Sequence, residues 1–380
     1  MPARIPNHNR SRSDDERFMR RGLELAERGR GHTAPNPIVG AVIVRGGKIV
    51  GEGWHRALGE SHAEVEALAR AGAAARGATL FVTLEPCVHW GRTPPCVDAL
   101  LAAGIARCVV AQRDPDPRVN GRGLRKLRAQ GVRVELGLLA DEAEEQLAAY
   151  RQVHATGRPR ITWKVASSLD GRIADARGRS QWITGLEARA DGHRLRAASD
   201  AIVVGAGTAR ADDPRLTARD GRGASESARR AQPLRVVVDS RLSLPKTLRV
   251  FSPPLARGTV AACTAAAPVA RERALAARGV TVWRLPAARL RVSLSALAER
   301  LAREGRHEVL LEGGGTLGAS FVRAGLVKRI VLYSAPFVLG GGLSWCDGLA
   351  LPLEHAARGR VVSASLVGVD ARIVVDLGDE

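Results

Sequence analysis

The chain has 380 residues, which exceeds the roughly 250–300 residues that one hydrophobic core usually serves, so two domains are expected. It contains no run of ~18 apolar residues, and no apolar segment follows the basic residues near its start, which argues against a membrane span and a secretory signal and predicts a cytoplasmic protein. The formal net charge of +19 fits either a surface for nucleic acid or phosphorylated substrates, or a coding bias toward Arg. Because the arginines are spread along the chain, the bias is favoured and no nucleic-acid partner is predicted.

The first half alternates helix and strand signals. Helices are predicted where apolar residues recur at helical spacing, and strands where short β-branched runs end at turn formers. The predicted helices cover 14–29, 62–77, 94–104, 121–131 and 140–157, and the predicted strands cover 38–44, 48–54, 78–86, 106–115 and 132–138. This alternation predicts an α/β domain of three layers, α/β/α, over residues 14–150, preceded by a disordered extension over 1–13.

A cluster of helix-breaking residues from Thr156 to Pro159 predicts a boundary, with a linker over 151–158 and a second α/β/α domain over 159–380. The polar segment 218–233 lacks periodicity and is predicted to be an exposed, flexible loop. The remaining predicted strands cover 160–174, 201–207, 235–240, 259–263, 280–286, 308–314 and 328–336, and the predicted helices cover 188–199, 295–305 and 316–325.

The cysteines fall into two groups. Five are present, and an odd number without a secretory signal argues against a disulfide framework. Cys108 and Cys263 lie in apolar runs and are predicted to be buried, while Cys346 has no assigned role. Cys87 and Cys96 differ because each follows a proline in a segment rich in turn formers.

The strongest motif combines His62-Ala63-Glu64 with Pro86-Cys87 and Cys96. One imidazole and two thiolates with an open fourth position are typical of catalytic zinc, which lowers the pKa of bound water. Glu64 is the candidate carboxylate for moving protons. Residues two apart do not face each other inside a helix, so His62 and Glu64 converge only if they occupy its first turn. A closed structural zinc site is the alternative, but no fourth ligand is evident.

These residues resemble the cytidine deaminase-like superfamily, whose signature is H-x-E followed by P-C. The eight residues between Cys87 and Cys96 depart from the usual P-C-x-x-C spacing. TAPNPIVGAVIV, VTLEPCVHWGRTPPC and DPDPRVNGRG are instead similar to the deaminase half of the bifunctional riboflavin biosynthesis family. The resemblance implies one Zn²⁺, and it implies pyrimidine and ribose-phosphate contacts from Asn36, His55, His89 and Arg92.

The second half carries two glycine-rich segments. Gly205-Ala206-Gly207 lacks the third glycine of a dinucleotide fingerprint because Arg210 stands at that position. In LLEGGGTLGAS, a strand ends at Glu312 and a helix is predicted to begin near Thr316, which suits a phosphate group. Arg196 and Arg219 suit a phosphate monoester, and Asp170 is either catalytic or a turn residue.

WKVASSLDGRIA, SQWITG, DAIVVGAGTARADDPRLTAR and LEGGGTLG resemble the reductase half of the same family. The resemblance implies a dihydrofolate reductase-like fold that uses NADPH. The implied NADPH contacts are Ala166, Trp182, Thr208, Asp212, Ser240, Gly314, Gly315, Thr316, Leu317, Gly318, Ala319 and Ser320. The implied substrate contacts are Lys164, Ser180, Arg196, Leu216, Arg219 and Glu312.

The family implies two consecutive reactions on a small phosphorylated pyrimidine, namely hydrolytic deamination of 2,5-diamino-6-(5-phosphoribosylamino)pyrimidin-4-one and NADPH-dependent reduction of its ribosyl group. A homo-oligomer, dimer or tetramer, is also expected. Three alternatives remain. The first is a nucleic-acid-editing deaminase, which would use the positive charge but leaves the second half unexplained. The second is a non-enzymatic zinc-binding module, which would need a fourth ligand. The third is that one half has lost activity.

Overall fold

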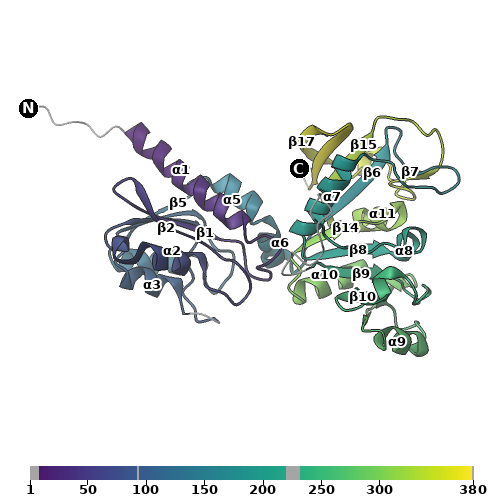
Figure 1. The fold of residues 1–380 in the computed structure, drawn as a ribbon, viewed down its shortest axis with the longest axis horizontal. Coiled ribbons are helices and arrows are strands. Elements are labelled where there is room, and N and C mark those ends of the chain that lie inside the picture. Colours follow the sequence, from purple (N-terminus) through teal and green to yellow (C-terminus); the bar gives the residue numbers. More distant parts are fainter. Residues whose placement is uncertain (1–7, 92–93, 220–231, 379–380) are drawn as a thin grey trace, which may run out of the picture. The chain divides into compact units, whose positions relative to one another are not determined.

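A computed structural model describes residues 8–91, 94–219 and 232–378 and divides the chain into two compact units, Met1–Thr156 and Gly157–Glu380. Each unit has a central sheet with helices on both faces (Figure 1). No helix within the described residues is both long enough and apolar enough to cross a membrane.

The first unit is built on a five-stranded sheet of order β2-β1-β3-β4-β5. β1 pairs antiparallel with β2 and β3, whereas β3, β4 and β5 are parallel. Gly46 and Gly47 connect β1 to β2 with φ of +57° and +74°, the backbone of a two-residue hairpin turn. The strands are β1 (Gly40–Arg45), β2 (Lys48–Trp54), β3 (Thr79–Leu84), β4 (Arg107–Gln112) and β5 (Arg133–Leu136).

Two layers of helices cover this sheet, as predicted. One face packs on α1 and α5 through a cluster that includes Met19, Phe81 and Ala143. The other face packs on α2, α3 and α4 through Ala67, Leu100 and Leu124, so the α/β/α prediction is confirmed. The helices are α1 (His8–Glu27), α2 (Ala63–Ala71), α3 (Cys96–Ala102), α4 (Arg122–Ala129), α5 (Ala140–Gln146) and α6 (Ala148–Thr156), with a 3₁₀ turn at Gly72–Ala75.

The expected end segments of this unit need correction. Helix α1 already begins at His8, so the expected disordered extension over 1–13 is helical from that residue, and residues 1–7 lie outside the described parts. The expected linker over 151–158 is helical up to Thr156, because α6 continues through it. The expected helix over 140–157 is divided in two at Leu147, whose buried side chain packs with Ala26 and Leu84.

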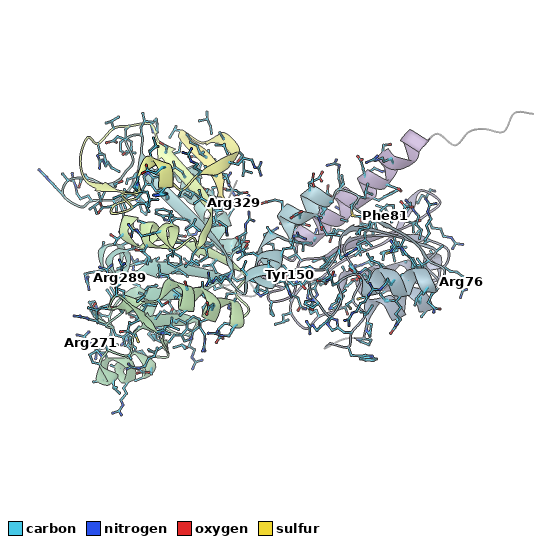
Figure 2. The ribbon with its side chains drawn as sticks, turned by 180° about the vertical axis from the view of Figure 1, so that it is seen from behind. Arg76, Phe81, Tyr150, Arg271, Arg289 and Arg329 are labelled. Carbon is cyan, nitrogen blue, oxygen red and sulfur yellow. The ribbon has the colours of Figure 1, made fainter. Side chains whose placement is uncertain are left out.

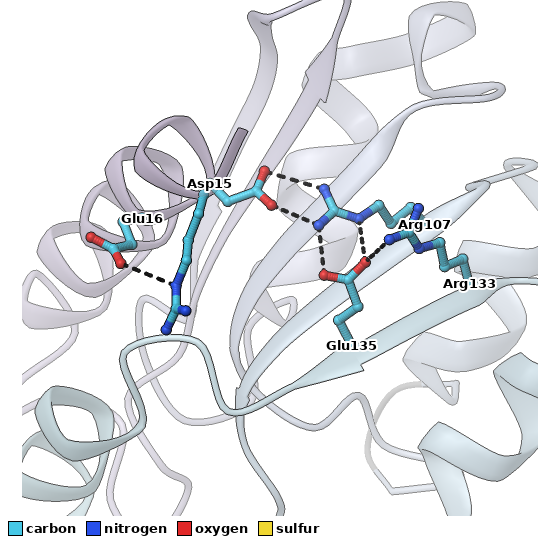
Figure 3. Close-up of polar contacts among 6 residues, drawn as sticks. Asp15, Glu16, Arg107, Arg133 and Glu135 are labelled. Atoms are coloured by element: carbon cyan, nitrogen blue, oxygen red, sulfur yellow. Dashed lines mark hydrogen bonds and ion pairs between the residues drawn. The ribbon is translucent and has the colours of Figure 1, made fainter. Parts of the chain in front are cut away.

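An ion-pair cluster ties helix α1 to the sheet edge of the first unit (Figure 3). The guanidinium of Arg107 on β4 donates to Asp15 of α1 at 2.6 Å and to Glu135 of β5 at 2.7 Å. Arg133 also contacts Glu135, at 2.9 Å. These arginines have carboxylate partners within the unit, which is one structural use of an Arg-rich composition.

The second unit contains a nine-stranded sheet of order β11-β10-β9-β8-β14-β6-β15-β18-β17. The first seven strands in this order are parallel, and β18 and β17 complete the sheet antiparallel. The strands are β6 (Arg160–Ser168), β8 (Ala201–Gly205), β9 (Leu234–Val238), β10 (Thr259–Cys263), β11 (Thr281–Arg284), β14 (Glu308–Leu311), β15 (Val327–Ala335), β17 (Gly359–Val367) and β18 (Asp370–Leu377).

Helices again cover both faces of the sheet. One face packs on α10 and α11 through Leu297 and Phe321, and the other packs on α7, α8 and α9 through Ala188, Ala209 and Leu275. Two short pairs, β7 with β16 and β12 with β13, lie outside the main sheet. The elements are α7 (Leu186–Ala198), α8 (Ala206–Asp212), α9 (Val269–Ala276), α10 (Leu294–Arg303), α11 (Gly315–Arg323), β7 (Arg172–Ala174), β12 (Ala287–Ala288), β13 (Arg291–Val292) and β16 (Leu343–Ser344), with 3₁₀ turns at Arg249–Phe251 and Leu353–His355.

The sequence did not predict helices α8 and α9 or the C-terminal pair β17–β18. The start of α8 overlaps the predicted strand over 201–207, and β17 has no buried face because eight of its nine residues are exposed. The predicted flexible loop over 218–233 falls mostly on residues 220–231, which lie outside the described residues.

Candidate functional site

The first unit brings His62, Cys87 and Cys96 together. His62 is the N-cap of α2, Cys96 opens α3, and Cys87 follows Pro86 after the end of β3. The Nδ1 of His62 lies 3.2 Å from Sγ of Cys96 and 3.6 Å from Sγ of Cys87. One donor atom from each residue lies within 4.8 Å of the others, and no other such group occurs among the described residues. One imidazole nitrogen and two sulfurs at this spacing fit tetrahedral zinc with an open fourth position.

The two thiols have opposite acidities. The hydrogen bond between their side chains lowers the pKa of Cys87 and raises that of Cys96, and burial raises the pKa of Cys96 further. The backbone N–H of Cys96 also donates to Sγ of Cys87 at 3.3 Å. A thiolate is therefore already favoured at Cys87, the form in which cysteine binds metal.

Glu64 lies in the first turn of α2, which begins at Ala63, so the prediction that His62 and Glu64 converge at a helix start is confirmed. The carboxyl is 4% exposed. Burial raises the pKa of Glu64, although His62 opposes this shift. A buried carboxyl beside the ligand set is a suitable group for accepting and donating protons in catalysis.

Asn36 and His55 form a connected pair. The amide nitrogen of Asn36 lies 3.1 Å from Nε2 of His55, and Nδ1 of His55 lies 3.1 Å from the carbonyl oxygen of Ser61. Since the Ser61 carbonyl only accepts, Nδ1 carries the proton and Nε2 accepts from Asn36. Burial lowers the pKa of His55, which keeps this imidazole neutral. The ring lies 5.4 Å from that of His62, centroid to centroid.

The remaining predicted contacts lie in the segment between the two cysteines. His89 has a buried Nδ1 that finds no hydrogen-bond partner within the described residues, as expected for an atom awaiting a ligand. Arg92 lies outside the described residues.

Sequence analysis did not single out Glu85, which precedes the Pro86-Cys87 pair. Its buried carboxylate accepts backbone N–H groups of Gly121 and Gly123 at 2.9 Å and of Asp114 and Leu124 at 3.3 Å. It therefore holds the 114–124 segment against the strand end that carries Cys87. The DPDPRVNGRG motif was the available signal, but sequence alone did not show what this motif contacts.

The second unit has a cavity of about 1900 Å³ above the carboxyl ends of its parallel strands. Most of the predicted cofactor and substrate residues line it: Lys164, Ala166, Ser180, Trp182, Arg196, Thr208, Asp212, Arg219, Ser240, Glu312, Gly314, Gly315, Thr316, Leu317 and Ser320. Leu216, Gly318 and Ala319 do not. Leu216 and Ala319 are buried in the core, and Gly318 packs against the indole of Trp163.

Charged side chains converge on one part of the cavity. Arg196 and Glu312 form a bidentate ion pair with two nitrogen–oxygen distances of 2.6 Å. Burial raises the pKa of Glu312, but pairing with Arg196 outweighs burial and leaves this pKa below its ordinary value. Burial lowers the pKa of Lys164, and Glu312 opposes that shift. Lys164, Arg196 and Glu312 thus form a cluster of opposite charges in the cavity lining, and this cluster can orient a sugar phosphate.

His193 is a cavity residue that sequence analysis missed. It lies one turn before Arg196 on α7, and this spacing was the available signal. Burial and the nearby positive charge of Arg196 lower the pKa of His193 to about 4, so the ring is neutral at pH 7. Its Nδ1 is buried without a partner among the described residues and is available to a ligand.

The predicted phosphate site forms at the start of helix α11. Gly314 is its N-cap, three residues after the end of strand β14, and the backbone N–H of Gly314 donates to Oγ1 of Thr208 on α8 at 2.9 Å. The nine-residue helix thus begins at the cavity wall with free backbone N–H groups in its first turn.

Two family models match the two units. The family described as "Cytidine and deoxycytidylate deaminase zinc-binding region" matches residues 12–112, and the "RibD C-terminal domain" matches residues 159–369. The chain is 43% identical over 352 residues to the riboflavin biosynthesis protein RibD of Chlamydia muridarum, covering 92% of this chain and 93% of that protein. The chain belongs to the RibD family.

Other RibD proteins agree. The Escherichia coli protein is 42% identical over 344 residues, covering 88% of this chain and 92% of its own length. The Acinetobacter baumannii RibD structure superposes with a TM-score of 0.88 at 36% identity, covering 97% of this chain and all of that chain. The Thermotoga maritima deaminase/reductase gives 0.85 at 32% identity with the same coverage.

As a RibD protein, the chain is a bifunctional riboflavin biosynthesis enzyme, with a zinc-binding, cytidine deaminase-like first unit and a pyrimidine reductase as its second unit. The cofactors are zinc, for which His62, Cys87 and Cys96 form a candidate site, and NADPH in the reductase unit.

Proposed function

We propose that the first unit replaces the 2-amino group of 2,5-diamino-6-(5-phosphoribosylamino)pyrimidin-4-one by oxygen and that the second unit then reduces the ribosyl group of the product to ribityl. The observation that carries the first step is the convergence of His62, Cys87 and Cys96 beside the buried Glu64. The second step is supported by the cavity, which joins a helix N-terminus to a buried Lys–Glu–Arg group.

In the deamination, zinc supplies Lewis-acid activation of water when it is bound. Glu64 takes the first proton that water loses and delivers it to the ring nitrogen, and it then transfers the second proton, from the added hydroxyl, to the amine that departs as ammonia. Burial raises the pKa of Glu64, which favours the protonated form that donates to the substrate. Asn36 and His55 hold the pyrimidine by hydrogen bonds, and His89 with Arg92 binds the ribose-phosphate end.

In the reduction, NADPH supplies the hydride, and the protein positions the two reactants. Lys164, Arg196 and Glu312 face the cavity and orient the ribosyl group. His193, neutral at pH 7, and the exposed Arg219 complete the substrate end. The start of α11 and Thr208 hold the cofactor's pyrophosphate.

We further propose that the deaminase domain comprises residues 14–150 and the reductase domain residues 159–380, that the enzyme acts in the cytoplasm on free metabolites without a nucleic-acid partner, and that it is a dimer or tetramer. Edge strand β17 supports an oligomer because Val361, Val362 and Leu366 are 59%, 40% and 76% exposed. An open apolar edge strand of this kind usually has a partner.

The test supplies the diaminopyrimidinone phosphate together with NADPH and follows ammonia release and loss of reduced-nicotinamide absorbance in one cuvette. The intact enzyme releases ammonia first and oxidises NADPH afterwards. Glu64→Gln retains stoichiometric zinc but releases no ammonia, while it still reduces the deaminated intermediate when that compound is supplied. Glu142→Gln, on the exposed face of α5, is the matched control and behaves like the intact enzyme. Full ammonia release by Glu64→Gln would refute the role of Glu64.

A further inference from the structure

Three arginines line the same end of the reductase cavity, and we call Arg241, Arg289 and Arg291 the arginine rim. Arg241 follows strand β9 after Asp239 and Ser240. Arg289 and Arg291 belong to the short β12–β13 hairpin, and Figure 2 labels Arg289. All three side chains are exposed, so their guanidinium groups are accessible from the cavity mouth.

The hairpin is fixed to the end of β9. The backbone N–H of Val292 donates to Oγ of Ser240 at 3.1 Å, and the side chain of Val292 is 3% exposed in the core below. Arg289 and Leu290 have φ of +47° and +66°, the conformation of a tight two-residue turn. Ser240 and the rim arginines are therefore held as one group and not as independent surface side chains.

The arginine rim carries positive charge that the protein does not neutralise. None of its three members forms an ion pair with a carboxylate in residues 8–91, 94–219 or 232–378, whereas Arg249 and Arg284 nearby pair with Asp213 and Glu272. The closest acid in sequence, Asp239, accepts from the hydroxyl of Ser243 and the backbone N–H of Leu244. Unpaired guanidinium groups beside a hydroxyl are typical of a phosphate site.

The sheet order relates this group to the start of helix α11. Strands β14, β8 and β9 are consecutive parallel neighbours, so their carboxyl ends lie along one edge. Helix α11 follows β14, and Ser240 follows β9, two strand spacings away, which is about 10 Å. The ribose of an adenine dinucleotide whose pyrophosphate sits at α11 can bridge that separation and place its 2′-oxygen at Ser240.

We propose that Ser240 and the arginine rim bind the 2′-phosphate of NADPH and make the reductase select NADPH over NADH. The two cofactors differ only by this dianionic group, so an interaction with it discriminates between them without touching the nicotinamide. At the other end of the cavity, the Arg196 guanidinium is bound by Glu312 and by the carbonyl of Thr217, so it is not a competing free site. The inference rests on the use of NADPH by this unit.

The test measures binding rather than turnover. Titration calorimetry of the full-length enzyme compares NADP⁺ with NAD⁺, and 2′,5′-ADP with 5′-AMP, for the intact chain, Arg289→Gln/Arg291→Gln and Arg241→Gln. We expect the double variant to lose about 10- to 100-fold in affinity for NADP⁺ and 2′,5′-ADP, equivalent to about 1.4–2.8 kcal/mol, with affinity for NAD⁺ and 5′-AMP changed less than about twofold. The salt dependence of NADP⁺ binding should also become weaker.

The matched control is Arg273→Gln/Arg303→Gln, which removes the same charge from exposed positions outside the cavity lining. It should bind all four ligands as the intact enzyme does. Equal losses for the ligands with and without a 2′-phosphate would overturn the proposal, as would unchanged NADP⁺ binding in the rim variants. If the control weakened NADP⁺ binding as much as the rim variant did, net charge and not the rim would be responsible. Failure of NADP⁺ binding in the intact chain would instead refute NADPH use itself.

Discussion

Arg196 and Glu312 meet in the lining of the reductase cavity in a two-point ion pair, with Nε–Oε1 and Nη2–Oε2 distances of 2.6 Å. Both side chains are less than one-fifth exposed, at 18% and 14%. A pair so well shielded has strong mutual dependence, because either partner alone would leave a charge without compensation.

Arg196→Met should therefore destabilise the second unit by about 3 kcal/mol, because Glu312 loses its partner. Arg196→Met/Glu312→Leu should recover much of this loss in thermal unfolding, since no unpaired charge remains. Both variants should lose reductase activity and keep ammonia release. Arg179→Met breaks a pair in which Arg179 is 71% exposed and should cost less than about 1 kcal/mol. Equal costs for the single and double variants would contradict mutual dependence.

Asp114 should make the stability of the first unit depend on pH. Its Oδ1 accepts from the backbone N–H of Asp116 at 2.8 Å and from the hydroxyl of Tyr150 at 3.1 Å. Burial raises the pKa of Asp114 to about 6, from an ordinary value of 3.8. The folded state thus holds this proton more tightly than the unfolded state. The stability that protonated Asp114 gives the first unit is therefore fully present below about pH 4 and is lost as pH rises through 6.

Asp114→Asn keeps the accepting oxygen and removes the ionisation. The free energy of unfolding of the variant should match that of the wild type near pH 4 and exceed it by an amount on the order of 2 kcal/mol at pH 7. Urea titrations of the first unit at several pH values measure the difference. Asp141→Asn, at an exposed site on α5, should show no such divergence. A constant offset between Asp114→Asn and wild type at all pH values would contradict the assignment.

Asp170 is predicted to act as a positioning residue. Its oxygens accept from the hydroxyl of Ser168 at 2.7 Å and from the backbone N–H groups of Leu339 and Gly340 at 3.0 and 2.9 Å. These bonds hold the pKa of Asp170 below its ordinary value. Asp170 does not line the cavity. The segment that it anchors, which contains Leu339 and Gly340, continues to Trp345, and Trp345 does line the cavity.

Asp170→Ala should raise the reductase KM for NADPH and substrate roughly five- to tenfold, equivalent to about 1–1.4 kcal/mol or the net value of about one hydrogen bond, with a smaller change in kcat. Asp170→Asn should be intermediate, since its amide nitrogen cannot accept from Gly340. Glu354→Ala, at an exposed position, is the control. If kcat vanished while KM stayed unchanged, Asp170 would belong to the chemistry itself.

Gly318 should be intolerant of any side chain. A Cβ there would lie 1.9 Å from the Trp163 indole, which is 1% exposed and fixed in the core. Gly318→Ala should lower the stability of the second unit by at least about 1–3 kcal/mol, as measured by thermal unfolding. Gly207→Ala, in helix α8 with no atom near its added Cβ, should instead stabilise by about 0.5–1 kcal/mol. Similar melting temperatures for both variants would show that Trp163 moves to accommodate the added methyl group and would contradict the prediction.

The motifs predicted what lies near them in sequence. His62 and Glu64 mark a helix start, and Pro86-Cys87 marks a strand end, so local chemistry sufficed to assemble the zinc ligands. The Arg196–Glu312 pair joins residues 116 positions apart, and both were expected to contact the substrate rather than each other. Their meeting depends on the strand order of the sheet, which periodicity does not encode.

Local patterns also fail where burial is incomplete. Strand β17 is exposed on both faces, so it has no buried side by which sequence analysis could recognise it, and it was not predicted. Sequence analysis left the role of Asp170 open because its partners Leu339 and Gly340 donate through backbone N–H groups. Almost every residue type has such a group, so the sequence does not reveal these contacts. The arginine rim was hidden in the sequence by the many other arginines and became visible only when their carboxylate partners were known.

Every apolar cluster of the described residues draws on one unit alone. Each half therefore has its own hydrophobic interior, and both halves belong to one continuous polypeptide. Translation of a single message supplies the two catalysts in equal numbers, without any separate control of gene dosage. A lesion inside one half would consequently erase one step of the conversion and spare its neighbour, so two such defective chains could complement each other in the same cell.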